Sequence, residues 1–134
     1  MSKPHEGLIY TMVVVSAADS DMTDSELHVI GDIVRLLPVF RDYDEAGLPA
    51  TAAGCAELLA EDDGLDRVID FVKGAVGDKL AETAYALACD VVAADGEANQ
   101  EELRLLEIIR HRLDIDRLIA AGIERGSRAR HMTG

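Results

Sequence analysis

The chain has 134 residues, and hydrophobic residues fill 49% of its positions, which is enough for one domain with one well-filled core. Its formal net charge is −13, which argues against binding to nucleic acid or anionic membrane, because phosphate contacts need clustered Lys and Arg. The composition includes no Trp, three Tyr and two Phe, so a platform that stacks single-stranded bases is not expected either.

The ends of the chain and its two cysteines indicate a cytoplasmic protein. The opening residues are polar and do not resemble a signal peptide. The longest nearly apolar run, residues 8–18, is too short for a bilayer, which needs about 20 residues, so no membrane insertion is expected. Cys55 and Cys89 lie in apolar helical stretches outside any CxxC motif, as buried thiols of a reducing compartment do.

Apolar residues recur at helical spacing along the whole chain, and strict strand alternation is absent. The spacing predicts helices at residues 6–18, 24–37, 52–61, 65–76, 79–94 and 100–113, with a short last helix from 115 to about 122. Pro38 and Gly77 are expected to end the second and fourth helices, and Thr51 to cap the third. We therefore predict an all-α fold, a single compact bundle of about seven helices over residues 1–134. Residues 1–5 and 125–134 are expected to be frayed tails.

An internal repeat supports this fold. A shift of 76 residues lays Val15–Leu37 on Val91–Leu113, and 8 of these 23 positions are identical. Acidic positions are shared as well: Asp19 matches Asp95, Asp21 matches Glu97, and Glu26 matches Glu102. The repeat predicts two helix–acidic loop–helix units related by a pseudo-twofold axis.

Helix capping explains part of the shared pattern. Thr23 and Asn99 are good N-cap residues, and Glu26 and Glu102 follow three positions later. This spacing is typical of a capping box, in which the cap side chain and the glutamate satisfy each other's free backbone N–H groups.

Capping does not explain Asp19 and Asp95, which face the negative end of a helix dipole, with Asp21 and Glu97 close by to add repulsion. Neither loop contains a basic residue. An Arg or Lys from elsewhere in the chain, the free N–H groups of the next helix or a bound cation would offset this repulsion. A hard divalent cation with oxygen ligands, Ca²⁺ or Mg²⁺ rather than Zn²⁺, is a candidate. The candidate ligands are Asp19, Asp21, Glu26, Asp95, Glu97 and Glu102.

Known metal and catalytic motifs do not fit these loops. An EF-hand needs glycine at the sixth loop position and glutamate at the twelfth, where this chain has Asp24 and Ile30. No His pair at helical spacing, glycine-rich phosphate loop or serine elbow is present. A metal-dependent hydrolase that uses the pooled carboxylates is an alternative, although the usual His–carboxylate pairs are missing.

At Ala93-Ala94-Asp95-Gly96-Glu97 and Glu101-Glu102-Leu103, and at the weaker copy from Ala17, the chain resembles the tellurite-resistance protein B (TerB) family. The resemblance spans residues 8–113. It implies a compact all-α fold with pseudo-twofold symmetry, a role in stress or metalloid response, no catalytic activity and an acidic metal-binding patch. Ser20 replaces the glycine of the motif, which puts the first loop's shape and ligand role in doubt.

The leading hypothesis is a non-catalytic acidic helical module that binds a divalent cation and a protein partner, with no nucleic-acid partner. Two alternatives stay open beside it: the hydrolase, and a pure protein-interaction domain without metal. A homodimer is also left open.

Overall fold

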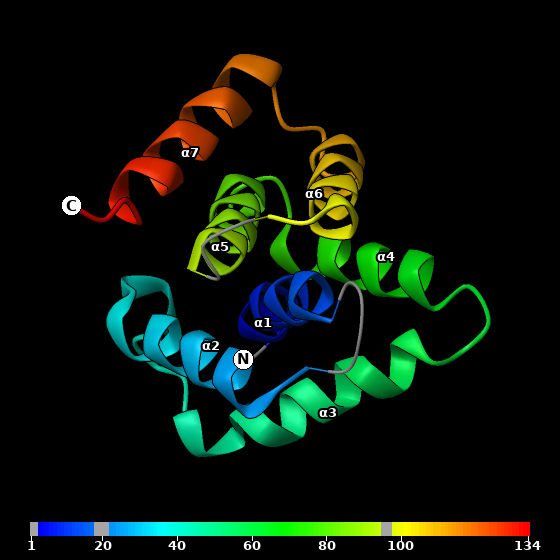
Figure 1. Cartoon of the computed structure of the whole chain (residues 1–134). Coiled ribbons are helices and arrows are strands. Elements are labelled where there is room, and N and C mark those ends of the chain that lie inside the picture. Colours follow the sequence, from blue (N-terminus) through cyan, green and yellow to red (C-terminus); the bar gives the residue numbers. More distant parts are fainter. Residues whose placement is uncertain (1–2, 18–21, 95–97) are drawn as a thin grey trace.

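The computed structural model describes residues 3–17, 22–94 and 98–134, and these fold into helices without a strand (Figure 1). The predicted all-α class is therefore confirmed for this part of the chain. Its elements are α1 (Lys3–Ser16), α2 (Asp24–Leu36), the 3-10 turns η1 (Pro38–Phe40) and η2 (Glu45–Gly47), α3 (Leu48–Leu59), α4 (Gly64–Val76), α5 (Ala81–Ala94), α6 (Gln100–Arg112) and α7 (Arg117–Arg130). None of these helices is long and apolar enough to cross a membrane.

Helix α1 lies at the centre of the bundle, as its sequence predicts. Because it is apolar nearly all round, it needs neighbours on every side. Helices α3, α4, α5 and α6 all pack against it (Figure 1). Leu8, Ile9, Met12 and Val15 are fully buried as a result.

Two helix pairs form the frame of the bundle. Helix α2 contacts α5 as well as its own neighbour α1, and α6 contacts α1 as well as its own neighbour α5. Helix α3 then covers α1, while α7 covers α5. This reciprocal packing is what two related units would give, but the pseudo-twofold symmetry itself stays a prediction.

Both predicted capping boxes are present. At α2 the Glu26 N–H donates to Thr23 Oγ1 at 3.1 Å, and the Thr23 N–H donates to Glu26 Oε1 at 2.8 Å. At α6 the Glu102 N–H donates to Asn99 Oδ1 at 2.8 Å, and the Asn99 N–H donates to Glu102 Oε1 at 3.0 Å. The two helices thus begin in the same way, one after each acidic loop.

The start of α3 differs from the prediction. The helix begins at Leu48, with Gly47 as N-cap and Pro49 in the first turn, where a missing N–H costs nothing. Thr51 is therefore not the cap. It lies inside the first turn, and its hydroxyl donates to the Gly47 carbonyl oxygen at 3.1 Å.

Parts of the two stretches predicted as frayed tails, residues 1–5 and 125–134, are helical. Helix α1 already begins at Lys3, and α7 continues past Gly122 to Arg130. His5 Nε2 lies 2.9 Å from the Val39 carbonyl oxygen, which ties the first turn of α1 to η1. The extension of α7 is fixed by long-range contacts to α5, which local sequence patterns do not reveal.

Candidate functional site

The predicted acidic cluster is only partly within the described residues. Asp19, Asp21, Asp95 and Glu97 lie outside them, so their arrangement is not described. Glu26 and Glu102 are described, and each carboxylate accepts a hydrogen bond from the backbone of its N-cap residue. Within residues 3–17, 22–94 and 98–134, no group of three or more His, Cys, Asp or Glu side chains is placed to hold a metal ion.

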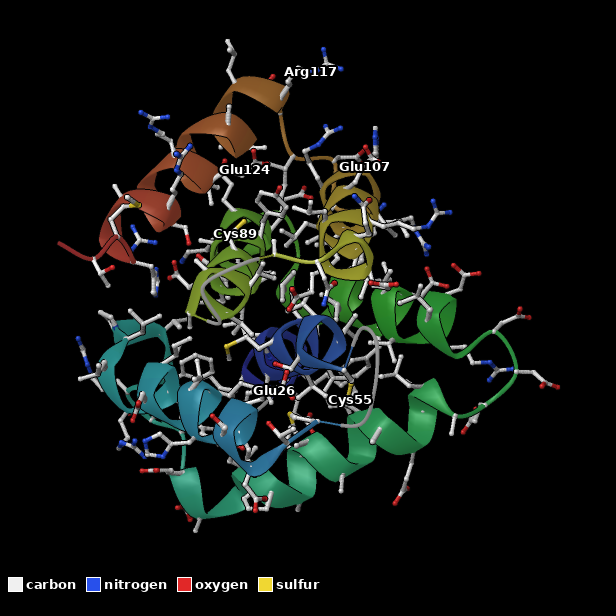
Figure 2. The ribbon with its side chains drawn as sticks, in the orientation of Figure 1. Glu26, Cys55, Cys89, Glu107, Arg117 and Glu124 are labelled. Atoms are coloured by element: carbon white, nitrogen blue, oxygen red, sulfur yellow. The ribbon has the colours of Figure 1, made fainter. Side chains whose placement is uncertain are left out.

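A groove lies between α6 and α7, with α5 as its floor. Its volume is about 530 Å³. Figure 1 shows α6 and α7 diverging from the short connection that joins them, and Figure 2 labels Cys89, Glu107 and Glu124 on the three bordering helices. No sequence motif pointed to this groove.

The inner surface of the groove is largely apolar. Tyr85, Cys89 and Val92 of α5 form the floor, and Leu106 of α6 lines one wall. Two large apolar side chains at its border are exposed to solvent: Leu103 of α6 is 50% exposed, and Met132, just after α7, is 66% exposed. Exposed apolar side chains beside a hollow are typical of binding surfaces.

The polar groups of the floor are held in their neutral forms. Burial raises the pKa of the Cys89 thiol to about 12, so a reactive thiolate is disfavoured at neutral pH. Burial also raises the pKa of Tyr85, whose hydroxyl donates to Glu124 Oε2 on α7 at 2.5 Å. Neither side chain of the floor is therefore an activated nucleophile at neutral pH.

Helix α7 is fixed to α5 by a second polar contact. Asp90 Oδ1 accepts a hydrogen bond from Ser127 Oγ at 2.7 Å and one from Arg130 Nη2 at 2.6 Å. Ser127 is only 2% exposed, so this contact is sheltered from water. Together with buried Ala120, it holds α7 as the far wall of the groove.

Charged side chains border the groove on both walls. Glu107 and Arg110 come from α6, and Glu124, Arg128 and His131 come from α7 and the residue after it. Arg110 and Arg128 form no ion pair within the described part of the chain. Arg110 Nη2 lies 2.9 Å from His111 Nε2, a contact that does not neutralise the arginine, so both positive charges can interact with a bound molecule.

In the described part of the first half, the corresponding helix face is covered. By the 76-residue shift, Gly31 and Val34 of α2 correspond to Glu107 and Arg110 of α6. Gly31 and Val34 are buried, and a Cβ added at Gly31 would lie 3.8 Å from Leu48 Cδ2 of α3. The change from small or apolar residues to charged ones was the sequence signal for the groove, because an exposed helix face tolerates charge and a packed one does not.

Comparisons with protein-family models, with curated proteins and with solved structures gave no match. The resemblance to the TerB family therefore rests on the motif residues alone.

Proposed function

We propose that this chain is a non-catalytic binding module, and that it holds a protein partner in the groove between α6 and α7. The observation that carries the proposal is the pair of exposed apolar side chains beside the groove, Leu103 at 50% and Met132 at 66% exposure. Covering such a surface removes apolar area from water, which favours binding by roughly 25 cal/mol per Å².

The shape of the groove favours a protein segment. It is bordered by three helices and runs between two of them, an arrangement in which an amphipathic helix can lay its apolar side against the floor. The neutral Cys89 and Tyr85 side chains support a binding role over a catalytic one. Cys55 and Cys89 are buried free thiols, which supports the cytoplasmic location proposed with this role.

Site-specific photocrosslinking in the native cells tests the proposal. A photoreactive amino acid replaces Leu103, which borders the groove, and in a control replaces Leu36, which is 79% exposed on α2. We expect a discrete partner, identified by mass spectrometry, from position 103 alone, and its purified form should bind the unlabelled protein. Equal crosslinking at both positions, or none at position 103, would contradict the proposal. Crosslinking to a second copy would identify a homodimer.

We further propose that the acidic loops bind a divalent cation, in the manner implied by the TerB resemblance. What supports this is the paired sequence pattern of Asp19, Asp21, Asp95 and Glu97, together with a capping box after each loop. The capping boxes fix where α2 and α6 begin, so each acidic stretch is followed by the N-cap of a helix.

A thermal unfolding experiment on chelator-treated protein tests the cation proposal. Millimolar Ca²⁺ or Mg²⁺ should raise the melting temperature, because a ligand that binds only the folded form stabilises it. The variant with Asp95→Asn and Glu97→Gln should lose this response and, without metal, be at least as stable as the parent. No response of the parent to any common divalent ion would refute the proposal. Metal-dependent turnover of a phosphoester would instead favour the hydrolase alternative.

A further inference from the structure

Helix α6 lies at the outside of the bundle and has one solvent-facing side, here called the outer face of α6 (Figure 1). Its exposed residues follow the spacing i, i+3, i+4, i+7 and i+11, which places them on one side of a helix: Gln100, Leu103, Arg104, Glu107 and His111. We infer that the protein partner is a second copy of this chain, which binds with its own α6 antiparallel to this face. This inference rests on the proposed function, because Leu103 belongs to the outer face and also borders the groove.

The shape of the outer face suits packing against another helix. The groove lies on one side of it, and a second hollow of about 380 Å³ is lined by residues of α6 itself. Leu103 and Glu107 line both hollows, so their side chains form a ridge between them. Helices pack when the ridges of one enter the grooves of the other, and this face has both.

The charges on and beside the outer face are balanced. Their sign alternates every three residues, from Glu101 through Arg104 and Glu107 to Arg110. None of these four side chains forms an ion pair within the described part of the chain. Two carboxylates and two guanidinium groups cancel, although the whole chain has a net charge of −13. A partner with a single sign of charge would meet as much repulsion as attraction here, whereas a copy of the same face can match every sign.

An antiparallel arrangement of two α6 helices achieves this match. About a twofold axis near the middle of α6, Arg104 of each copy lies opposite Glu107 of the other. In the same register Gln100 lies opposite His111, and the amide and the imidazole can form a hydrogen bond. A parallel arrangement would place each side chain opposite its own counterpart, so that like charges meet. The antiparallel contact also covers Leu103, which flanks the charged pairs and is 50% exposed in the single chain.

The strength of this contact depends on the charges that meet within it. The net charge of −13 on each copy opposes association, but at physiological salt charges more than about 8 Å apart are largely screened. A contact through one helix face is small, and small interfaces are typically weak and transient. We therefore expect a dimer that forms and dissociates with the protein concentration.

Sedimentation velocity from micromolar to millimolar concentration tests the inference on the full chain. We expect the parent to change from monomer to dimer over this range. Arg104→Glu sets two carboxylates opposite each other, and Glu107→Arg sets two guanidinium groups opposite each other, so each variant should raise the Kd of the dimer about tenfold or more.

Two rescue experiments follow from the antiparallel register. An equal mixture of the Arg104→Glu and Glu107→Arg variants should associate again, because every carboxylate at these positions then faces a guanidinium group. The double variant Arg104→Glu/Glu107→Arg should dimerise like the parent, because the exchange keeps opposite charges face to face. A loss of pairing within one helix would not be rescued by mixing two chains.

Two variants elsewhere separate the local pairs from the overall charge. Arg41→Glu, just after η1, and Glu57→Arg, on α3, change the net charge by the same amounts as the two α6 variants, and both side chains are exposed. Neither should change the Kd of the dimer, and circular dichroism checks that every variant is folded.

The outcomes separate this inference from the proposed function. A parent that stays monomeric, association that the single α6 variants leave unchanged, or a mixture that does not associate would each overturn the inference. If position 103 then crosslinks to a different protein, the proposed function stands without it. If position 103 also crosslinks to nothing, both are wrong.

Discussion

Leu27 and Leu103 occupy the same position in two helices but have different surroundings. Each donates its backbone N–H to the carbonyl oxygen of its helix's N-cap, Thr23 or Asn99, at 3.0 Å. The Leu27 side chain packs against the core, whereas Leu103 is 50% exposed beside the groove. One half of the fold thus packs against its core, as a partly buried side chain, the leucine that the other half leaves half exposed.

This pair gives a matched test of the difference between the halves. Leu27→Ser should lower the free energy of unfolding by about 1–2 kcal/mol, because it removes packed apolar surface. Leu103→Ser should change it by no more than about 0.5 kcal/mol, because its side chain is half in solvent already. Urea denaturation measures both. Equal losses would mean that Leu103 is buried in solution.

The capping boxes predict a second pair of stability losses. Thr23→Ala and Asn99→Ala should each lower the free energy of unfolding by about 0.5–2 kcal/mol, since each leaves a first-turn N–H without its acceptor. Ser25→Ala, an exposed change in the same first turn as the Thr23 contact, is the control and should have little effect. If both cap variants match this control in chemical denaturation, α2 and α6 begin elsewhere.

The contact between Asp90 and α7 predicts a loss that depends on burial. Asp90→Ala leaves the buried Ser127 hydroxyl without its acceptor, which should cost about 1–3 kcal/mol and speed amide exchange in α7. Asp66→Ala removes a carboxylate that also pairs with an arginine, Arg112, but is 68% exposed, so it should cost at most about 1 kcal/mol. Hydrogen exchange of the α7 amides and the free energy of unfolding from denaturation measure these two effects. A smaller effect at Asp90 than at Asp66 would mean that α7 does not depend on this contact.

The two thiols predict an alkaline loss of stability. Burial raises the pKa of Cys55 and of Cys89 to about 12, from an ordinary value of 9.0. The unfolded chain therefore loses these protons from about pH 9, while the folded chain keeps them until about pH 12. Their contribution to stability is complete below pH 9 and is lost as the pH rises to about 12. A Cys55→Ala/Cys89→Ala variant should show a shallower decline in this window.

Iodoacetamide labelling at pH 8 tests whether the two thiols are buried and protonated in the folded chain. Both thiols should react much more slowly in the folded chain than in urea, because the thiolate is the reactive form. Rapid labelling of the native protein would contradict the burial of these side chains.

Local sequence patterns predicted the helices and their N-caps because both depend on residues close together in the chain. The spacing of Leu65, Val68, Ile69 and Val72 defines one face of α4, and Gly77 ends that helix as predicted. The Thr23 and Asn99 caps followed from the glutamates three positions later. Helix α3 begins at Leu48, four residues before its predicted start, because Pro49 fits a first helical turn.

The candidate groove depends on long-range packing and was not predicted. The end of α7 is poor in large apolar residues, and it is held by Ser127 and Arg130 on Asp90, which lies on α5. Its helical extent therefore could not be read from local periodicity. The opening beside α6 depends on the length of residues 113–116 and on which face α7 covers. Only the replacement of Gly31 and Val34 by Glu107 and Arg110 in the repeat signalled an uncovered face.

A protein partner bound in the groove between α6 and α7 would cover the side chain at position 103. Because the chain contains no Trp, a single Leu103→Trp substitution provides a fluorescent reporter at the groove, and Leu36→Trp provides one outside it. Each variant is titrated with the purified partner recovered by crosslinking at position 103. We predict a saturable blue shift of the emission from Trp at position 103 and no shift from Trp at position 36. A silent reporter at position 103 with a responsive one at position 36 would place the partner elsewhere and contradict the claim.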